Sequence, residues 1–503
     1  PDSGTLKKIG IGAAVVARIR TWYGLGDAAF DEVIADMNAH RFGVRLGKDY
    51  VYGLEPDPAD PHGAPDASSH VIFQPPRALA EEFLHQRIRT GTKKVTGDDG
   101  DLREMPIYRS KFEVWRAHPH KRTYRTVTFA PPPKVCDARD YNLWTGFAVT
   151  PLTPPAGATN GDLDAWLHHD VMTKCDAYLE LLHDVICSAN VDHYHYLLDL
   201  LAFTTQFPGV PSEVATMLKG EMGAGKGTFV RHFGRLFGRH YTQLDKTEHL
   251  AGKFNVALSG KVVVFADEAF FAGDRRDLGS LKRLITEPTL AIERMGIDVV
   301  EEPNFVHLFM ATNEDWAHQA GMRERRFFTL HVSDARTQDL AYFARIIAQL
   351  KDGGYEALLA LLLHRPTTHD HIRRVPKTDE LRVQQELSLD PELKWWREKL
   401  IDGCLEADEA WPEATEPQAL FMDYIRWCDV MKVNRRTSKI DLLRRVLEPW
   451  LGPRQKRGGE RVRPLRPLAE ARALFDARFG TRTDWADDVA DGVVEARPGA
   501  DLF

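Results

Sequence analysis

The sequence contains few cysteines, no long apolar run and no recognisable secretion signal. Its five cysteines are scattered without a Cys-x-x-Cys pair, so neither a zinc ribbon nor a disulfide framework is indicated. No stretch approaches the roughly 18 uninterrupted apolar residues that a membrane-spanning helix needs. The N-terminus does not combine a basic start with an apolar core and a small-residue cleavage site. These absences predict a cytoplasmic protein without a membrane role.

Length and charge set the scale of the protein. A chain of 503 residues predicts roughly three folded units. The hydrophobic share of 43% and the charged share of 28% are typical of a globular protein. A net charge of -7 argues against a uniformly basic coat protein that covers nucleic acid, although it allows a local basic channel. Because the chain begins at Pro1 rather than at an initiator methionine, we expect a further domain upstream.

The apolar pattern divides the chain into parts. Short alternations between turn-rich stretches predict an N-terminal α/β region with strands at 112–115 and 123–129. Residues 365–385 are polar and aperiodic, which indicates a linker. The expected parts are an α/β accessory region (1–150), a helical subdomain (151–207), a sheet with crossover helices (208–335), a helical segment with the linker (336–385) and a C-terminal domain (386–503).

A glycine-rich segment lies between an apolar run and a helical pattern. Glycines let backbone N–H groups converge on phosphate oxygens, the helix N-terminus adds its positive end, and Lys226 can neutralise the β and γ phosphates. The segment therefore predicts a P-loop that binds ATP, and a glycine turn with a chance lysine is the alternative. The residues that would surround the phosphates are Gly220, Gly223, Ala224, Gly225, Lys226, Gly227 and Thr228.

One position departs from the usual P-loop. The residue after the lysine, normally a serine or threonine that ligates magnesium, is Gly227, and Thr228 lies one position further. Either Thr228 reaches the metal through a shifted backbone, or the ion depends on water and on the acidic strand described next. The sequence leaves both arrangements open.

Two carboxylates, Asp267 and Glu268, follow a continuous apolar run at 262–266. Such a run is typical of a buried central strand, whose end would lie beside the P-loop. We expect Asp267 to hold the magnesium shell and Glu268 to polarise the attacking water as general base. A strand that ends in a solvated acidic turn is the alternative interpretation.

A third apolar run, at 305–312, ends at Asn313, whose amide could orient the lytic water or touch the γ phosphate. Arg325 and Arg326 then precede a strand-like segment at 327–332. Either arginine could reach the nucleotide of a neighbouring subunit and stabilise charge on the transferring phosphoryl group, which requires an oligomer. A solvated ion-pair network is the alternative for this arginine pair.

Together these motifs resemble the superfamily 3 helicases of the AAA+ class, in particular the helicase module of phage and plasmid primase-helicases. The upstream segment YNLWTGF at 141–147 looks like a further landmark of that family. The resemblance implies an AAA+ P-loop ATPase core that uses ATP and Mg²⁺. The segments that carry it, in family order, read GEMGAGKGTF, LAGKFN, VVVFADEAFF, LKRLITEPTLAIERMG, MATNEDW and RERRFF.

The resemblance also implies a ring, usually a hexamer, that encircles one DNA strand and moves along it through a central hairpin. That hairpin would be 292–300, where Arg294 would take the place of the lysine near its tip. A basic residue there can pair with the phosphate backbone, and a surface turn with one arginine is the alternative. Lys282 belongs to the same family motif. Such a phage replication protein would act in the bacterial host cell, with a primase or polymerase domain or partner.

A basic segment at 452–463 follows a helical pattern at 439–447. This order suggests a winged-helix-like C-terminal domain, whose wing would touch DNA phosphates through its basic residues. A solvated basic loop is the alternative, because charge runs usually face water. Trp395 and Trp396 are expected to be core anchors rather than platforms for base stacking.

The leading hypothesis is an ATP- and magnesium-dependent DNA helicase that forms a homo-oligomeric ring on single-stranded or forked DNA. Its first rival is an AAA+ ATPase of a mobile-element or defence system that remodels protein–DNA complexes without processive unwinding. A second rival is a P-loop kinase for a small molecule, which would need an acceptor pocket and a lid.

Overall fold

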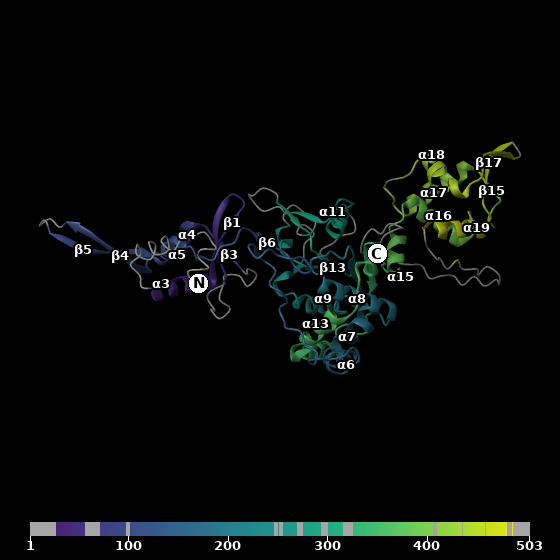
Figure 1. Cartoon of the computed structure of the whole chain (residues 1–503). Coiled ribbons are helices and arrows are strands. Elements are labelled where there is room, and N and C mark those ends of the chain that lie inside the picture. Colours follow the sequence, from purple (N-terminus) through teal and green to yellow (C-terminus); the bar gives the residue numbers. More distant parts are fainter. Residues whose placement is uncertain are drawn as a thin grey trace.

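The protein is a mixed α/β structure with many helices, and its largest described sheet is parallel. Figure 1 shows an N-terminal part, a central part that holds this sheet, and a C-terminal part. Among the described residues no helix is both long and apolar enough to cross a membrane. The computed structural model describes residues 27–55, 71–96, 101–245, 250, 255–268, 275–292, 300–314, 325–405, 410–434, 436–457, 459–479 and 485.

In its described residues, the N-terminal part combines a three-stranded antiparallel sheet with three helices and a long hairpin. Met37, Leu79 and Trp115 are fully buried in its core. The hairpin formed by β4 and β5 projects from this part, at the far left of Figure 1. The elements are α3 (Asp27–His40), β1 (Arg41–Leu46), β2 (Asp49–Leu54), β3 (Ile72–Gln74), α4 (Pro76–Glu82), β4 (Arg87–Thr96), β5 (Leu102–Ser110), α5 (Lys111–Ala117), β6 (Val127–Thr128) and β7 (Tyr141–Asn142).

The expectation of a strand at 112–115 is wrong, because these residues lie in α5. A capping box starts this helix: the Ser110 hydroxyl accepts a hydrogen bond from the N–H of Glu113, whose carboxylate accepts one from the N–H of Ser110. At 123–129 only the two residues of β6 form a strand, and they pair with β7. Local capping therefore outweighs the apolar alternation at 112–115.

The central sheet has the strand order β14-β8-β13-β10-β9, and every neighbouring pair in it is parallel. All six residues of β13 are buried, as expected of a strand covered on both faces. Along β10, Val263 and Phe265 face one core while Val264 and Ala266 face the other. The strands are β8 (Ala215–Lys219), β9 (Tyr241–Leu244), β10 (Val263–Asp267), β13 (His307–Thr312) and β14 (Phe327–His331).

Helices from three stretches of the chain share one core with this sheet. Leu182, Leu201 and Leu358 pack in the same buried cluster as Phe233 and Phe265, so the helices before Pro208 do not form a core of their own. The helices and short helical turns on this side are α6 (Asn160–Trp166), η1 (Leu167–Val171), η2 (Met172–Lys174), α7 (Asp176–Glu180), η3 (Leu181–Ile186), α8 (Val191–Gln206), α9 (Lys226–Arg235), η4 (Gly238–His240), α12 (Leu340–Gln349), η6 (Leu350–Gly354) and α13 (Tyr355–His364).

The other face of the sheet is covered by α11 (Arg275–Thr286), whose Leu281, Leu284 and Ile285 are buried against it. Next to this helix lie η5 (Val256–Leu258) and the antiparallel pair of β11 (Thr289–Ile292) and β12 (Val300–Pro303).

The interpretation of 365–385 as a linker is wrong. This stretch contains α14 (His369–Ile372) and the first turns of α15 (Asp379–Leu387). The Thr378 hydroxyl donates to the carbonyl oxygen of Thr329 in β14 at 2.5 Å, and α15 packs beside that strand. The segment is thus part of the central fold.

The C-terminal part has its own core, in which Trp395, Trp396 and Trp450 are fully buried. The prediction that Trp395 and Trp396 anchor a core is confirmed. A small sheet of order β15-β17-β16 packs with the helices. The elements are α16 (Pro391–Asp402), β15 (Ala414–Thr415), α17 (Pro417–Val430), α18 (Lys439–Asp441), η7 (Leu442–Val446), η8 (Glu448–Trp450), β16 (Gln455–Arg457), β17 (Glu460–Pro464) and α19 (Leu468–Phe479).

Candidate active site

Three neighbouring strands, β8, β13 and β10, end at one edge of the central sheet. The register pairs Lys219 with Thr312 and Asp267 with Ala311, so the carboxyl ends lie side by side. The glycine-rich loop follows β8 directly. In open parallel sheets, ligands bind outside this edge of the strands.

The glycine-rich loop has backbone conformations that favour glycine. Gly223 has a φ of 83° and Gly225 a φ of 103°, both in the left-handed region. A Cβ added to Gly220 would lie 2.9 Å from the carbonyl oxygen of Val332. Because the loop leads straight into α9, which begins at Lys226, backbone N–H groups and the positive helix end come together here.

The loop borders a cavity of about 910 Å³. Most of the residues that the sequence assigned to phosphate and metal binding line it, namely Gly223, Ala224, Gly225, Lys226, Gly227, Thr228, Asp267 and Glu268. Seven further residues of the described part of the chain also line it: Met222, Arg231, Gln243, Asp245, Gln338, Leu340 and Phe343. Gly220 lies at the base of the loop, against Val332.

Lys226 is a nearly buried cation at this cavity, with 8% of its surface exposed. Its Nζ donates to the carbonyl oxygens of Gly220 at 2.5 Å and Glu221 at 2.9 Å. Burial lowers the pKa of Lys226, while the nearby carboxylates of Asp267 and Glu268 favour its charged form. The negative charge of an anion in the cavity would offset this cost of burial and favour the charged form of Lys226.

The carboxylates of Asp267 and Glu268 lie at the end of β10. Burial raises the pKa of Asp267, and the positive charges of Arg231 and Lys226 oppose that rise. The side chain of Gln243 donates to Oδ2 of Asp267 at 3.1 Å. Glu268 has a φ of 56°, unusual for a residue other than glycine, and its N–H donates to the carbonyl of Ala311 at 3.0 Å.

The residues present fit a nucleoside triphosphate. They also fit a magnesium ion, except that Gly227 stands where a serine or threonine usually ligates it. The glycine loop and Lys226 suit phosphate oxygens, while the carboxylate of Asp267 and the hydroxyl of Thr228 suit a hard cation. Among the described side chains, no group of three or more His, Cys, Asp or Glu could hold a metal ion. A magnesium ion here would therefore take further oxygens from phosphate and water.

Asn313 and Lys282 are not among the described residues that line the cavity. Asn313 is exposed directly after β13, outside the lining. Lys282 is half-buried on α11, where its carbonyl accepts a hydrogen bond from the Thr286 hydroxyl at 2.8 Å. Arg294 lies outside the described residues, as does most of the predicted hairpin at 292–300.

Arg325 and Arg326 lie at the opposite edge of the sheet from the glycine-rich loop. The N–H of Ala215, at the start of β8, donates to the carbonyl of Arg326 at 2.7 Å. Both arginines line a separate cavity of about 180 Å³ together with Glu213. Within one chain they therefore do not share the cavity of Lys226.

Several lining residues were not predicted from the sequence. Arg231 stands one helical turn after Gly227, a spacing that could have signalled it. Gln243 comes from β9, and Gln338 and Phe343 come from the turn before α12 and its first turn. The tertiary fold brings these last three residues to the cavity from distant parts of the chain, so the sequence around each of them gave no indication of a role there.

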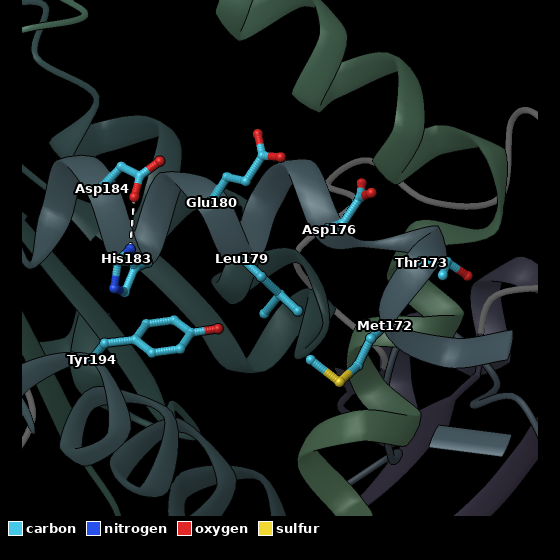
Figure 2. Close-up of a pocket in the computed structure, with 8 residues that line it drawn as sticks. All are labelled: Met172, Thr173, Asp176, Leu179, Glu180, His183, Asp184 and Tyr194. Atoms are coloured by element: carbon cyan, nitrogen blue, oxygen red, sulfur yellow. Dashed lines mark hydrogen bonds and ion pairs between the residues drawn. The ribbon is translucent and has the colours of Figure 1, made fainter. Parts of the chain in front are cut away.

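A second hollow lies on the helices before Pro208 (Figure 2). It has a volume of about 340 Å³, and its lining includes Asp176, Glu180 and Asp184, spaced one helical turn apart. The Asp184 carboxylate pairs with His183 at 2.6 Å, as Figure 2 shows. The eight described residues that line it include neither lysine nor arginine, so it would repel the phosphates of a nucleotide.

Known proteins resemble the chain in sequence and in fold. A family model described as a family of unknown function, DUF5906, matches residues 218–326. The DNA primase-polymerase of Nitratiruptor phage NrS-1 is 23% identical over 237 residues, covering 44% of this chain and 33% of the phage protein. The chain thus spans about a third of the length of that curated relative.

Solved structures of the C-terminal region of NrS-1 have the same overall fold. One apo structure has a TM-score of 0.58 at 15% identity and covers 89% of this chain and 99% of its own. An A-form apo structure has a TM-score of 0.57 at 15% identity, with 87% and 98% covered. The likeness extends well beyond the matched family model, into the N-terminal and C-terminal parts.

Proposed function

We propose that the chain is the ATP-hydrolysing module of a phage replication protein and acts as a magnesium-dependent DNA helicase. One observation carries the proposal: a glycine-rich loop with Lys226 and the carboxylates of Asp267 and Glu268 line a single cavity at the ends of β8 and β10. Similarity to the NrS-1 primase-polymerase supports a role in phage replication. The interpretation as an AAA+ P-loop core of superfamily 3 belongs to the same proposal.

In this proposal each residue of the cavity has a distinct task. Lys226 and the loop N–H groups bind the β and γ phosphates and offset their charge. Asp267 and Thr228 hold a magnesium ion, which neutralises charge that develops on the phosphates. Glu268 orients the attacking water and accepts its proton.

The hydrolytic site is completed in this proposal by a second subunit. Asn313 follows β13 in the same chain without lining the cavity, so it would have to turn toward the nucleotide to orient the water, whereas Arg325 or Arg326 reaches the γ phosphate of the neighbour. Both arginines lie at the amino ends of the strands, away from the cavity of their own chain. This position supports the arrangement, because a head-to-tail ring brings one surface of a subunit against a different surface of the next. We therefore propose a homo-oligomeric ring, with six subunits as in the superfamily 3 helicases that the motifs resemble.

The C-terminal part supports DNA as the partner. From α16 to β17 its elements run helix, strand, helix, helix, strand, strand, and the first strand pairs with the last. This order supports the proposal of a winged helix, which α19 then follows. Arg454, Lys456 and Arg461 are exposed on or beside the hairpin of β16 and β17. We propose that this hairpin contacts DNA phosphates, while Arg294 and Lys282 contact the translocating strand.

Strand displacement on a forked duplex tests the proposal. The chain should release the displaced strand only with ATP and Mg²⁺, and single-stranded DNA should stimulate hydrolysis. Lys226→Ala should abolish both activities because it removes the phosphate counter-charge. Hydrolysis without displacement would favour the protein-remodelling ATPase, and transfer of phosphate to a small molecule would favour the kinase.

A further inference from the structure

Gly227 and Arg231 lie one turn apart on α9, and the arginine covers the glycine. A Cβ added to Gly227 would lie 2.6 Å from Nη2 of Arg231 and 2.8 Å from its Cζ. The guanidinium therefore fills the space that a serine or threonine side chain at 227 would need. Since the conflicting atoms are the far end of a flexible side chain, a substitution at 227 would displace the guanidinium rather than the helix.

The same guanidinium faces the acidic end of β10. Nη1 of Arg231 lies 3.8 Å from Oδ2 of Asp267, and the arginine side chain is 52% exposed. So long and exposed an ion pair contributes little to stability. Arg231 also lines the cavity beside Lys226 and Thr228, so a small rotation would bring it to an anion held there.

We propose that Arg231 binds the phosphates of the nucleotide directly, and that glycine at 227 gives its guanidinium access to them. The inference rests on the proposed function, since it concerns the same cavity. A guanidinium presents paired N–H donors that match phosphate oxygens in a bidentate way. Arg231 thus supplies from the chain itself part of the charge that a hydroxyl-anchored magnesium ion offsets in the usual P-loop.

This arrangement changes how nucleotide binding depends on metal. With Lys226 and Arg231 both lining the cavity, the chain itself offers two positive charges to the triphosphate even when no divalent cation is present. When Arg231 turns to the phosphates it also leaves the carboxylate of Asp267, which then becomes available to a metal ion. The nucleotide should therefore bind without metal more tightly than in a P-loop with serine or threonine at this position.

Titration with a fluorescent ATP analogue tests the proposal by binding rather than turnover. Arg231→Ala should weaken binding about tenfold in EDTA and by less in Mg²⁺. Gly227→Ser should weaken binding in EDTA to a similar extent, because its side chain displaces the guanidinium. The double variant Gly227→Ser with Arg231→Ala rebuilds the usual loop, so it should bind well in Mg²⁺ and weakly in EDTA.

Arg235 offers a matched control on the same helix. Its guanidinium lies 5.0 Å from the centre of the Tyr355 ring, and the residue does not line the cavity. Arg235→Ala removes the same charge from α9 and should leave both affinities unchanged. Arg231→Lys keeps the charge but not the paired donors, so it should fall between the wild type and Arg231→Ala.

Two results separate the failure of this inference from failure of the proposed function. If Lys226→Ala abolishes binding while Arg231→Ala binds like the wild type in both EDTA and Mg²⁺, the phosphate role of Arg231 is overturned and the nucleotide site remains. If the wild type itself binds no nucleotide under either condition, the proposed function fails together with the inference. Thermal unfolding of each variant identifies a folding defect, and for a defective Arg231→Ala the folded Arg231→Lys decides the outcome.

Discussion

Lys219 and Glu380 form a largely buried ion pair, with Nζ of the lysine 3.4 Å from Oε1 of the glutamate. Lys219 is the last residue of β8, directly before the glycine-rich loop, and Glu380 belongs to the first turn of α15. The other oxygen of Glu380 lies 3.4 Å from Nδ1 of His331 at the end of β14. One carboxylate thus holds α15 against the ends of two strands at the base of the candidate site.

Removal of this carboxylate should destabilise the central fold. Glu380→Ala leaves Lys219 with only 13% of its side chain exposed and without the glutamate partner, which should cost about 3 kcal/mol. The urea midpoint measures this destabilisation. Asp379→Ala is the matched control on the same turn, because the Asp379 side chain is 93% exposed, and it should change the midpoint little. Equal midpoints for the two variants would contradict the structural role of α15.

The sequence could not reveal α15 because the helix buries polar residues. Gln384 is fully buried and Glu380 nearly so, and the side-chain amide of Gln384 donates to the Glu380 carboxylate at 2.8 Å. The face of the helix that packs on the sheet therefore lacks the regular spacing of apolar residues by which a sequence indicates a helix. The glycine-rich loop and the end of β10 could be predicted because their chemistry is local: a run of buried strand residues followed by Lys226 or by Asp267.

Glu268→Gln should separate nucleotide binding from hydrolysis. The amide keeps the size of the side chain but accepts no proton from water, so turnover should fall by about 100-fold or more. Binding of the fluorescent ATP analogue should remain, since Lys226 and the loop are unchanged. Glu314→Gln is the control, because Glu314 is exposed after the neighbouring strand β13 and does not line the cavity. Normal turnover in Glu268→Gln would remove Glu268 from the role of general base.

Mixed oligomers should show which arginine acts across the subunit interface. Arg325 is exposed, whereas Arg326 is half-buried and its carbonyl accepts a hydrogen bond from the N–H of Ala215. We therefore expect Arg325 to reach the neighbouring subunit. Neither Arg325→Ala nor Lys226→Ala should hydrolyse ATP alone. Mixing the two should restore part of the activity, because an intact Lys226 site then meets an intact Arg325 from the neighbour.

Two outcomes would contradict this assignment. Activity of Arg325→Ala alone would show that Arg325 is not needed, and failure of the mixture would show that both residues act within one chain. Arg326→Ala, tested in the same mixture, distinguishes a shared role from a single finger. Analytical ultracentrifugation of each variant confirms that the oligomer still forms.

The stability of the central fold should fall in mild acid because of His307. This first residue of β13 is 2% exposed, and its Nδ1 lies 3.1 Å from the Thr204 hydroxyl on α8. Burial lowers the pKa of His307 to about 3, whereas an unfolded histidine titrates near 6.5. Below about pH 6.5 the unfolded chain therefore binds a proton that the folded chain excludes, and stability falls by up to about 1.4 kcal/mol per pH unit.

Unfolding midpoints between pH 5 and 7.5 measure this dependence. His307→Gln should flatten the curve, since it removes the group whose protonation favours the unfolded chain. Thr204→Val is the matched control: it removes the hydrogen-bond partner of the imidazole but keeps the buried histidine, so the midpoint should drop while the pH dependence remains. An unchanged slope in His307→Gln would show that other groups cause the acid sensitivity.

The basic residues of the C-terminal hairpin should divide into DNA contacts and one structural arginine. Arg463 is 7% exposed, and its guanidinium donates to the carbonyl oxygens of Gly452 at 2.8 Å and of Leu443 at 3.2 Å. The expectation that all basic residues of 452–463 face DNA is therefore wrong for Arg463, which fastens the hairpin to η7. Arg463→Ala should unfold this part of the protein.

Substitution of Arg454, Lys456 and Arg461 by alanine should instead weaken DNA binding. It should leave the fold intact, because all three side chains are exposed. Fluorescence anisotropy with duplex DNA at several salt concentrations measures the effect. Removal of each side chain that neutralises a phosphate should lower the slope of log affinity against log salt by about 0.9. A triple variant that binds DNA with the wild-type slope would make the hairpin a solvated basic loop, since a surface that neutralises phosphates must release counterions when it binds.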